Sequence, residues 1–381
     1  MTPAAPAAAA RLAARSHADQ VVRPQVAQWE RDGRFPREAI AAAARDGLTG
    51  LFAPVEAGGL GLSFAEGMPV FEELGRGDAA YAFALSMHNA VTTTVTRFAA
   101  EAPRERWGRR LTAGEALGGF VATEPQGGSD PAGNTTLATP LAGGGWRIRG
   151  RKAWVTLAGE ADVYLVLCRT AEGRGYRDQL LALVEAERPG VSVARSYDTM
   201  AARFLPIGEL ELDVEIGADE VVVPPGSGFQ AALGAIDVAR ADIAAIAVGL
   251  AAGALDVALA WAQRRELYGA PLLDLQALQF MLADVETDIV AGRLLVAHAA
   301  SLLGTPGGSV ACAHAKRFCP AAALRAALAC SEVLGGYGWL NDTPLPRLIA
   351  LAKMLQVVDG TTEVQRVVIG RELRRRPQPR G

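Results

Sequence analysis

The stretch of this sequence best suited to chemistry is residues 120–130, which read FVATEPQGGSD. Two adjacent glycines, Gly127 and Gly128, carry no side chain, so main-chain N–H groups there can approach a large planar or phosphorylated ligand. Thr123 and Ser129 place a hydroxyl group on either side of the glycines. The motif alone leaves two interpretations open, a ligand-binding loop and a solvated turn built on proline and glycine.

A second strand-like segment, GRKAWVTLAG at residues 150–159, favours the ligand-binding interpretation. Trp154 supplies an aromatic plane, and Thr156 supplies a third hydroxyl group. If both segments face the same place, they predict a site for a flat ligand.

The composition limits the kind of protein to which these segments belong. The chain has 381 residues and is 50% hydrophobic, enough for two or three domains or one large multi-layer unit. Its 38 basic and 41 acidic residues are interspersed, and the formal net charge of -3 argues against a nucleic-acid-binding or membrane-binding surface. The one basic run, Arg371 with Arg374 to Arg376, is interpreted as a solvated terminus.

The cysteines and the N-terminus indicate a reducing compartment. Four cysteines form no disulfide framework and no CxxC pair, so we expect no metal site. The N-terminus is rich in alanine but lacks the compact apolar segment of a signal peptide. The expected location is cytoplasmic.

Periodicity divides the chain into three predicted domains. Helical periodicity covers residues 1–118, short alternating runs between turn residues cover 119–226, and long helical patterns cover 227–381. The segment ELELDVEI, residues 209–216, alternates acidic and aliphatic residues as a half-buried strand does. The predicted fold class is α+β multidomain, with an N-terminal α-helical domain, a middle antiparallel β-barrel or sandwich and a C-terminal four-helix bundle.

Particular helices follow from the same patterns. They are expected over residues 64–74, 81–98, 235–264, 309–334 and 346–356, with one more on the apolar stripe Leu275, Leu278, Leu282, Val285 and Ile289. The second of them carries His88 and Asn89 in an apolar setting. We interpret these two side chains as satisfied core groups, with contact to a substrate as the alternative.

Six segments, in this order along the chain, resemble the acyl-CoA dehydrogenase family of flavoproteins. They are FPREAIAAAARDGLTGLFAPVEAGGLGLS, TEPQGGSD, GRKAWVT, RRELYG, SEVLGGYG and VVDGTTEVQR. The resemblance implies FAD as the cofactor and α,β-dehydrogenation of an acyl thioester carried by coenzyme A or by an acyl-carrier protein. It also implies a homo-oligomer, most often a homotetramer, and an electron-transfer flavoprotein or oxygen as electron acceptor.

The resemblance also implies roles for particular residues. Those expected to bind the flavin or its diphosphate, partly across a subunit boundary, are Val121, Thr123, Gly128, Ser129, Trp154, Thr156, Arg265, Tyr268, Gln276, Glu332, Gly335, Gly336, Thr361 and Glu363. Those expected to contact the substrate are Ser129, Asp237, Arg240 and Gly360. For Arg240 the alternative is a structural pair with an acid such as Asp237. Three residues, Ala201, Tyr268 and Glu332, depart from the Gly, Phe and Gln usual in the family.

The family's catalytic base is a glutamate just before a Gly-Thr pair, and Asp359 occupies that position here. Burial beside an apolar substrate would raise the pKa of an aspartate toward the operating range. Its side chain is one methylene shorter, and a misplacement of about 1 Å can cost about a hundredfold in rate. In some relatives the base lies on the long bundle helix instead, but Ala239 stands there, so Asp359 is the predicted base.

Two alternatives to an acyl thioester dehydrogenase stay open. Aspartate at this position resembles nitroalkane oxidases, which take a proton from a carbon next to a nitro group. The second alternative is a family member that binds flavin but is catalytically inactive.

Overall fold

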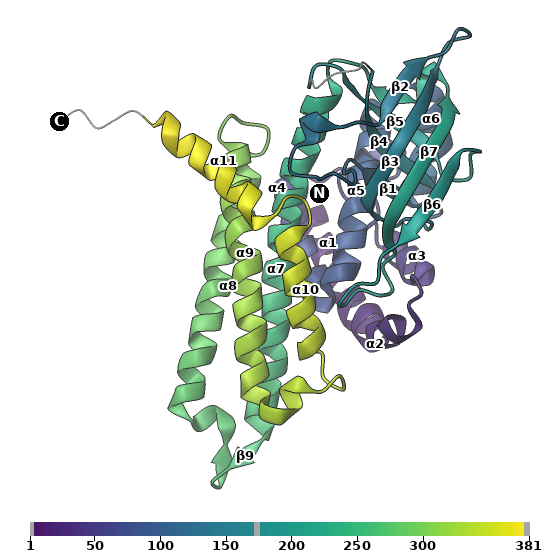
Figure 1. Cartoon of the computed structure of the whole chain (residues 1–381). Coiled ribbons are helices and arrows are strands. Elements are labelled where there is room, and N and C mark those ends of the chain that lie inside the picture. The colour runs from purple at the N-terminus through teal and green to yellow at the C-terminus, as the bar shows by residue number, and fades with distance from the viewer. Residues whose placement is uncertain (1–3, 171–175, 377–381) are drawn as a thin grey trace, which may run out of the picture. The chain divides into compact units, whose positions relative to one another are not determined.

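The computed structural model describes residues 4–170 and 176–376 (Figure 1). The chain forms two compact units. The first unit contains Met1–His17, Pro24–Ser63 and Ala84–Ile236, and the second contains Ala18–Arg23, Phe64–Phe83 and Asp237–Gly381. The division into three domains stays a prediction.

The first unit is built on one eight-stranded sheet. Its strands are β1 (Gly118–Val121), β2 (Leu137–Pro140), β3 (Trp146–Thr156), β4 (Val163–Arg169), β5 (Gln179–Glu185), β6 (Val191–Ser196), β7 (Ile207–Ile216) and β8 (Val221–Val223). They lie in the order β6-β7-β3-β2-β4-β5-β8, and β1 pairs with β4. The pairing is antiparallel except that β1 and β2 run parallel to β4. Along β7 the aliphatic residues are buried and most of the acids exposed, as the alternation predicted.

The first unit also contains all or part of several helices. They are α1 (Ala4–His17), α2 (Arg23–Asp32), α3 (Arg37–Arg45), α5 (Ala79–Phe98) and α6 (Glu101–Thr112). Val91 and Val95 of α5 and Trp107 and Leu111 of α6 join one buried apolar cluster with Leu165 and other side chains of β4 and β5. Burial of this surface is the main force that holds the helices to the sheet.

His88 and Asn89 are core groups of the first unit, as interpreted from the sequence. His88 Nδ1 accepts a hydrogen bond from the N–H of Gly118, and Nε2 lies 3.0 Å from the carbonyl oxygen of Leu111. The Asn89 amide accepts from Leu51 N–H and donates to two carbonyl oxygens. Burial lowers the pKa of His88 to about 4, so the ring is neutral near pH 7.

The second unit consists of α4 (Phe64–Gly77), part of α5, most of α7 (Gly228–Arg264), and then α8 (Gln276–Leu302), α9 (Gly308–Leu334), α10 (Leu345–Val357) and α11 (Thr362–Arg375). The long helices run side by side and form the predicted C-terminal bundle (Figure 1). Helices α4 and α7 touch through their backbones, because a Cβ atom on Gly249 would lie 2.0 Å from the carbonyl oxygen of Glu72. This contact has room only for glycine.

Two helices, Gly228–Arg264 and Gly308–Trp339, are long and apolar enough to cross a membrane by length and composition. Their most apolar windows are 78% and 50% buried inside the protein. Buried core helices of a helical bundle have the same length and apolar composition.

Helix α11 was not predicted. Its residues 362–375 include part of the basic run, which is exposed as expected but helical up to Arg375. The helix begins with Thr361, whose hydroxyl group accepts a hydrogen bond from Val364 N–H. A threonine N-cap is a signal that sequence analysis could have used.

Candidate active site

The loop after β1 has the open backbone that its glycines predicted. Gly127 has φ 143°, and a Cβ atom there would have no heavy atom within 4 Å. A Cβ atom on Gly128 would lie 3.0 Å from the hydroxyl oxygen of Thr123, so glycine lets the backbone approach this hydroxyl group. Ser129 is exposed and Thr123 is half-buried, whereas Val121 is buried at the end of β1.

Trp154 is turned out of the sheet by a break in strand pairing. The register of β3 with β7 shifts between Lys152 and Val155, and Trp154 has φ 56°. The residue is 62% exposed, and its ring packs on Tyr197 with 4.5 Å between the ring centroids. Thr156, two residues later, is buried. The tryptophan therefore presents an aromatic surface to solvent from an otherwise regular strand.

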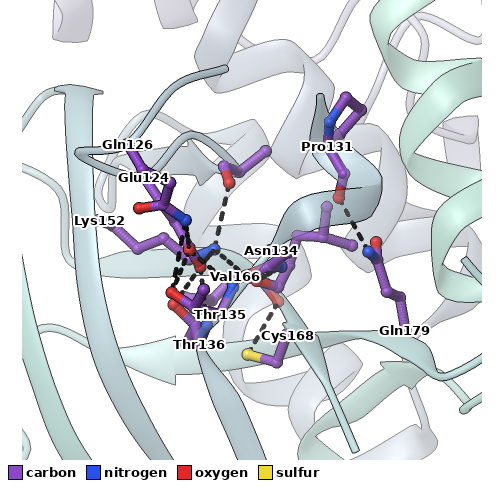
Figure 2. A network of polar contacts seen from close by, with 12 residues as sticks. Glu124, Gln126, Pro131, Asn134, Thr135, Thr136, Lys152, Val166, Cys168 and Gln179 are labelled. Carbon is purple, nitrogen blue, oxygen red and sulfur yellow. Dashed lines mark hydrogen bonds and ion pairs between the residues drawn. The ribbon is translucent and has the colours of Figure 1, made fainter. Parts of the chain in front are cut away.

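A buried ion network ties these two segments together (Figure 2). Lys152 Nζ lies 3.0 Å from Glu124 Oε1 and also donates to the carbonyl oxygen of Ala122 and to Asn134 Oδ1. Glu124 further accepts four hydrogen bonds from the N–H and hydroxyl groups of Thr135 and Thr136.

The network has a definite charge state and reaches the backbone. Burial acts to raise the pKa of Glu124, but the charge of Lys152 and the threonine hydrogen bonds outweigh it and lower that pKa to about 2. Ala153 N–H, next to Trp154, donates to the carbonyl oxygen of Thr123. The structure thus brings together the two segments singled out by sequence, through Glu124 and Lys152, which sequence reasoning missed.

The second unit carries the predicted base in a sharp turn between α10 and α11. Asp359 has φ 51° and Gly360 has φ 92°. Aspartate is one of the few residues with a side chain that tolerate such a conformation. Within the described part of the chain, Asp359 Oδ2 is buried and has no hydrogen-bond partner. Such an orphaned oxygen is costly in a folded protein unless a ligand or a reaction uses it.

Two cations face this carboxyl group. Burial raises the pKa of Asp359 to about 6, while the charges of Lys316 and Arg240 act to lower it. A Cβ atom on Gly360 would lie 3.7 Å from Arg240 Nη2, so the guanidinium group lies against the turn. Gln365 of α11 donates to the carbonyl oxygen of Gly360 over 2.9 Å and also holds the turn.

Arg240 also makes the structural pair considered from sequence. Its Nη1 lies 2.8 Å from Asp237 Oδ1, which in turn accepts a hydrogen bond from Ser309 of α9. Burial raises the pKa of Asp237, against the effect of Arg240 and Ser309. The pair fixes Arg240 on the side of α7 that faces Gly360.

Comparison with known proteins decides the family. Family models described as acyl-CoA dehydrogenase N-terminal, middle and C-terminal domains match residues 7–115, 119–214 and 226–374. The chain belongs to the acyl-CoA dehydrogenase family. Members of this family are FAD-dependent oxidoreductases that act on CH–CH donors. The family and the fold inferred from sequence are therefore confirmed.

Individual acyl-CoA dehydrogenases are similar over almost the whole chain. An acyl-CoA dehydrogenase of Bacillus subtilis is 33% identical over 363 residues, 94% of this chain and 95% of that protein. The structure of butyryl-CoA dehydrogenase from Megasphaera elsdenii superposes with a TM-score of 0.93 at 30% identity, covering 98% of this chain and 100% of that one. The structure of a glutaryl-CoA dehydrogenase from Mycobacterium smegmatis, solved in complex with FADH2, superposes with a TM-score of 0.89 at 26% identity. The match covers 98% of this chain and 96% of that one.

The remaining family positions of the second unit lie mostly on its surface. Tyr268 and Gly269 form the tip of a hairpin between β9 (Glu266–Leu267) and β10 (Ala270–Pro271), both with positive φ. Tyr268 is 92% exposed. The other exposed positions are Arg265, Gln276, Glu332, Gly335, Gly336 and Glu363.

These positions fall into two groups within the second unit. The β9 hairpin lies at the end of the long helices opposite to the turn between α10 and α11 (Figure 1). Thr361 and Glu363, by contrast, directly follow Asp359 and Gly360 at that turn. The structure thus brings Asp359, Gly360, Arg240 and Asp237 together but leaves Tyr268 away from them.

Lys316 is the other residue that sequence reasoning missed. It is only 1% exposed on α9, and its ammonium group donates to the carbonyl oxygen of Leu355 over 2.6 Å. A signal was available, since the sequence has lysine at only three positions, Lys152, Lys316 and Lys353. A lysine in an alanine-rich helix that also carries three cysteines is a candidate for a buried role.

Proposed function

We propose that this acyl-CoA dehydrogenase family member oxidises an acyl thioester to its α,β-enoyl product, with Asp359 as the base that removes the α-proton. The observation that carries the proposal is the buried, unpartnered Oδ2 of Asp359. Since the pKa of this group is raised to about 6, it is ionised at neutral pH and still basic enough to accept a proton.

The chain has the features that an isoalloxazine and its diphosphate require. Exposed Trp154 offers a flat apolar face, and Gly127 and Gly128 offer backbone without a side chain. Thr123 and Ser129 supply hydroxyl donors, and exposed Arg265 suits an anion through its fork of N–H groups. We therefore assign FAD to these residues. When bound, FAD supplies the acceptor for the hydride that leaves the β-carbon.

The protein's own groups supply the proton chemistry. Asp359 takes the α-proton, and its enclosure keeps the carboxylate poorly solvated, which increases its basicity. Val358 N–H makes the last hydrogen bond of α10, to the carbonyl oxygen of Met354. Asp359 is the next residue after Val358. We propose that its N–H donates a hydrogen bond to the thioester carbonyl oxygen as negative charge develops there. Arg240, held by Asp237, orients the turn at Gly360.

We assign the acyl group to coenzyme A or to a carrier protein, and the electrons to an electron-transfer flavoprotein or to oxygen. These are the carriers and acceptors that the family resemblance implies. We further propose a cytoplasmic location, because the four cysteines, all free and buried, suit a reducing compartment.

We also propose a homo-oligomer, most simply a homotetramer, in which one chain completes the cofactor site of another. Tyr268 and its hairpin lie at the opposite end of the helices from Asp359, so one chain does not bring both to the same ligand (Figure 1). Large apolar side chains are also exposed on the second unit, at 63% for Phe280, 68% for Leu294 and 86% for Trp339. Such a surface is typical of an interface between subunits.

Anaerobic titration of the flavoprotein with a panel of acyl thioesters tests the proposal. A substrate of the proposed kind bleaches the oxidised flavin absorbance in the wild-type protein, and the enoyl product is then found by mass spectrometry. The Asp359→Asn variant binds flavin but is bleached far more slowly. Equal bleaching rates in the two proteins would remove Asp359 from the mechanism.

One observation supports a second candidate, a flavin oxidase of the nitroalkane type. The base is an aspartate where the family usually has a glutamate, and nitroalkane oxidases share this aspartate. Rapid hydrogen peroxide release with a nitroalkane, together with no bleaching by any thioester, would select this alternative.

A further inference from the structure

Lys316 is a buried cation whose role the proposed function does not explain. Small apolar residues near it in the sequence of α9, including Ala313, Ala315 and Cys319, are also buried. Within the described chain its ammonium group makes one hydrogen bond, to the carbonyl oxygen of Leu355. A buried ammonium group with a single neutral acceptor is destabilising. Its presence therefore points to a function.

The acceptor that Lys316 uses has a special position in α10. In a continuing α-helix the N–H of residue i bonds the carbonyl oxygen of residue i−4, so the N–H of Asp359 would bond Leu355. The chain instead leaves the helix at Val358, which has φ -62° and ψ 152°, and turns at Asp359 with φ 51°. The ammonium group thus occupies the carbonyl oxygen that helical continuation would need.

We infer that Lys316 is a positioning residue for Asp359: its ammonium group ends α10 by binding the Leu355 carbonyl oxygen, which leaves the N–H of Asp359 free, and its charge faces the Asp359 carboxyl group. This inference rests on the proposed function, because it concerns how the proposed base is held. It goes beyond that function by assigning a residue on another helix to the placement and the ionisation of the base.

The charges around the carboxyl group support this role. Asp359 is faced by Lys316 from α9 and by Arg240 from α7. Arg240 is already paired with Asp237, whereas Lys316 forms no ion pair in the described chain. The nearby thiol of Cys312 is neutral, since burial raises its pKa to about 12. Lys316 is therefore the cation whose charge is not already matched by a paired acid.

The two groups titrate on either side of neutral pH. Burial raises the pKa of Asp359 to about 6 against the effect of Lys316, and burial lowers the pKa of Lys316 to about 8 against the effect of Asp359. Between these values the carboxylate is ready to accept a proton while the ammonium group still holds Leu355. Turnover in the wild type is accordingly expected to rise near pH 6 and to fall near pH 8.

Kinetics of Lys316→Met and Lys316→Arg across pH test the inference in the flavin-loaded enzyme. Methionine removes the charge and the donor, so the acid limb of kcat/KM moves up by about one pH unit, which lowers kcat/KM about fivefold at pH 6, and kcat falls even on the plateau. Arginine keeps the charge and a donor, so the acid limb of the pH profile stays in place. Because a guanidinium group does not lose its proton in this range, the alkaline limb disappears. Lys353→Met, which removes an exposed lysine of α10, keeps the wild-type profile.

Each outcome separates this inference from the proposed function. If Lys316→Met follows the wild-type pH profile with the same plateau while Asp359→Asn is inactive, the role of Lys316 is refuted and the base stands. If Asp359→Asn turns over normally, the proposed base is refuted instead.

Amide hydrogen exchange in the wild-type protein tests the same inference without a variant, in case the methionine variant does not fold. The amide of Asp359 should exchange much faster than the amides of Leu351 to Leu355 in α10. Protection of that amide at the level of the helix would overturn the inference.

Discussion

Two lysines are buried in this protein, one in each unit, and their surroundings differ. Lys152 is 0% exposed and donates to three oxygens, one of them on the ionised carboxyl group of Glu124. Lys316 is 1% exposed, donates to one backbone carbonyl and faces Asp359 without forming an ion pair. Glu124 accepts hydrogen bonds at both oxygens, whereas Oδ2 of Asp359 accepts none from the described residues.

The difference separates a structural network from a reactive one. A carboxylate whose lone pairs are filled, and whose pKa is near 2, has little tendency to take a proton at neutral pH. A carboxylate with a free buried oxygen and a pKa near 6 is poised to take one. We therefore expect the Glu124 network to determine stability and cofactor retention, and the Asp359 pair to determine turnover.

The largest expected effect is on turnover, which should depend strongly on Asp359 and only weakly on Glu124. Asp359→Asn should lower turnover per bound flavin by about 10²- to 10⁴-fold, the usual contribution of a general base. Asparagine tolerates positive φ, so the turn should be preserved. Glu124→Gln should leave turnover per bound flavin within a few fold but lower the amount of flavin retained. Stopped-flow reduction normalised to flavin content measures both, and equal losses in the two variants would contradict the comparison.

The next effect concerns stability. Lys152→Met leaves the Glu124 charge buried without its partner, which should lower the free energy of unfolding by about 3–5 kcal/mol. The double variant with Glu124→Gln should recover part of this loss, because no unpaired charge remains. Urea unfolding gives the values, with Lys353→Met as the exposed control, expected within about 0.5 kcal/mol of wild type. A Lys152→Met protein as stable as this control would show that the network is dispensable.

The smallest expected effect is on the pH dependence of stability, to which Glu124 and Asp359 should contribute with opposite signs. The pKa of Glu124 falls from 4.5 to about 2 on folding, so the unfolded state binds more protons and this group adds stability as pH rises through that window. The pKa of Asp359 rises from 3.8 to about 6, so the native state binds more protons and this group loses stability as pH rises between those values.

Urea midpoints at a series of pH values measure these slopes against the wild type. Glu124→Gln should remove the rising contribution, and Asp359→Asn should remove the falling one. Slopes of the same sign for the two groups would contradict their assignment to different charge environments.

Sequence alone was sufficient for the fold class and the family, for physical reasons. Strand alternation in residues 209–216 and the helical stripe along α8 are local patterns, and each leads to an element with one buried face. Helix α11 was missed because its basic residues suggested a solvated tail, although Thr361 was available as an N-cap.

The candidate site was predicted less completely, because its chemistry depends on distant partners. Trp154 and Asp359 could be named from their motifs, but their positive φ and the orphaned oxygen of Asp359 follow from the folded backbone. Glu124 lies inside the first motif, yet its partner Lys152 comes from another strand. Lys316 approaches Leu355 from a different helix, and no local pattern encodes that contact.

The contact between α4 and α7 has a consequence for synthesis on the ribosome. Helix α4 buries Met68, Val70, Phe71 and Leu74, and its backbone packs on α7 at Gly249, which follows the whole sequence of the first unit. The nascent chain must therefore expose this apolar helix until α7 has emerged. That interval makes α4 a favoured binding site for chaperones, and it makes slowed translation after residue 77 a hazard for solubility.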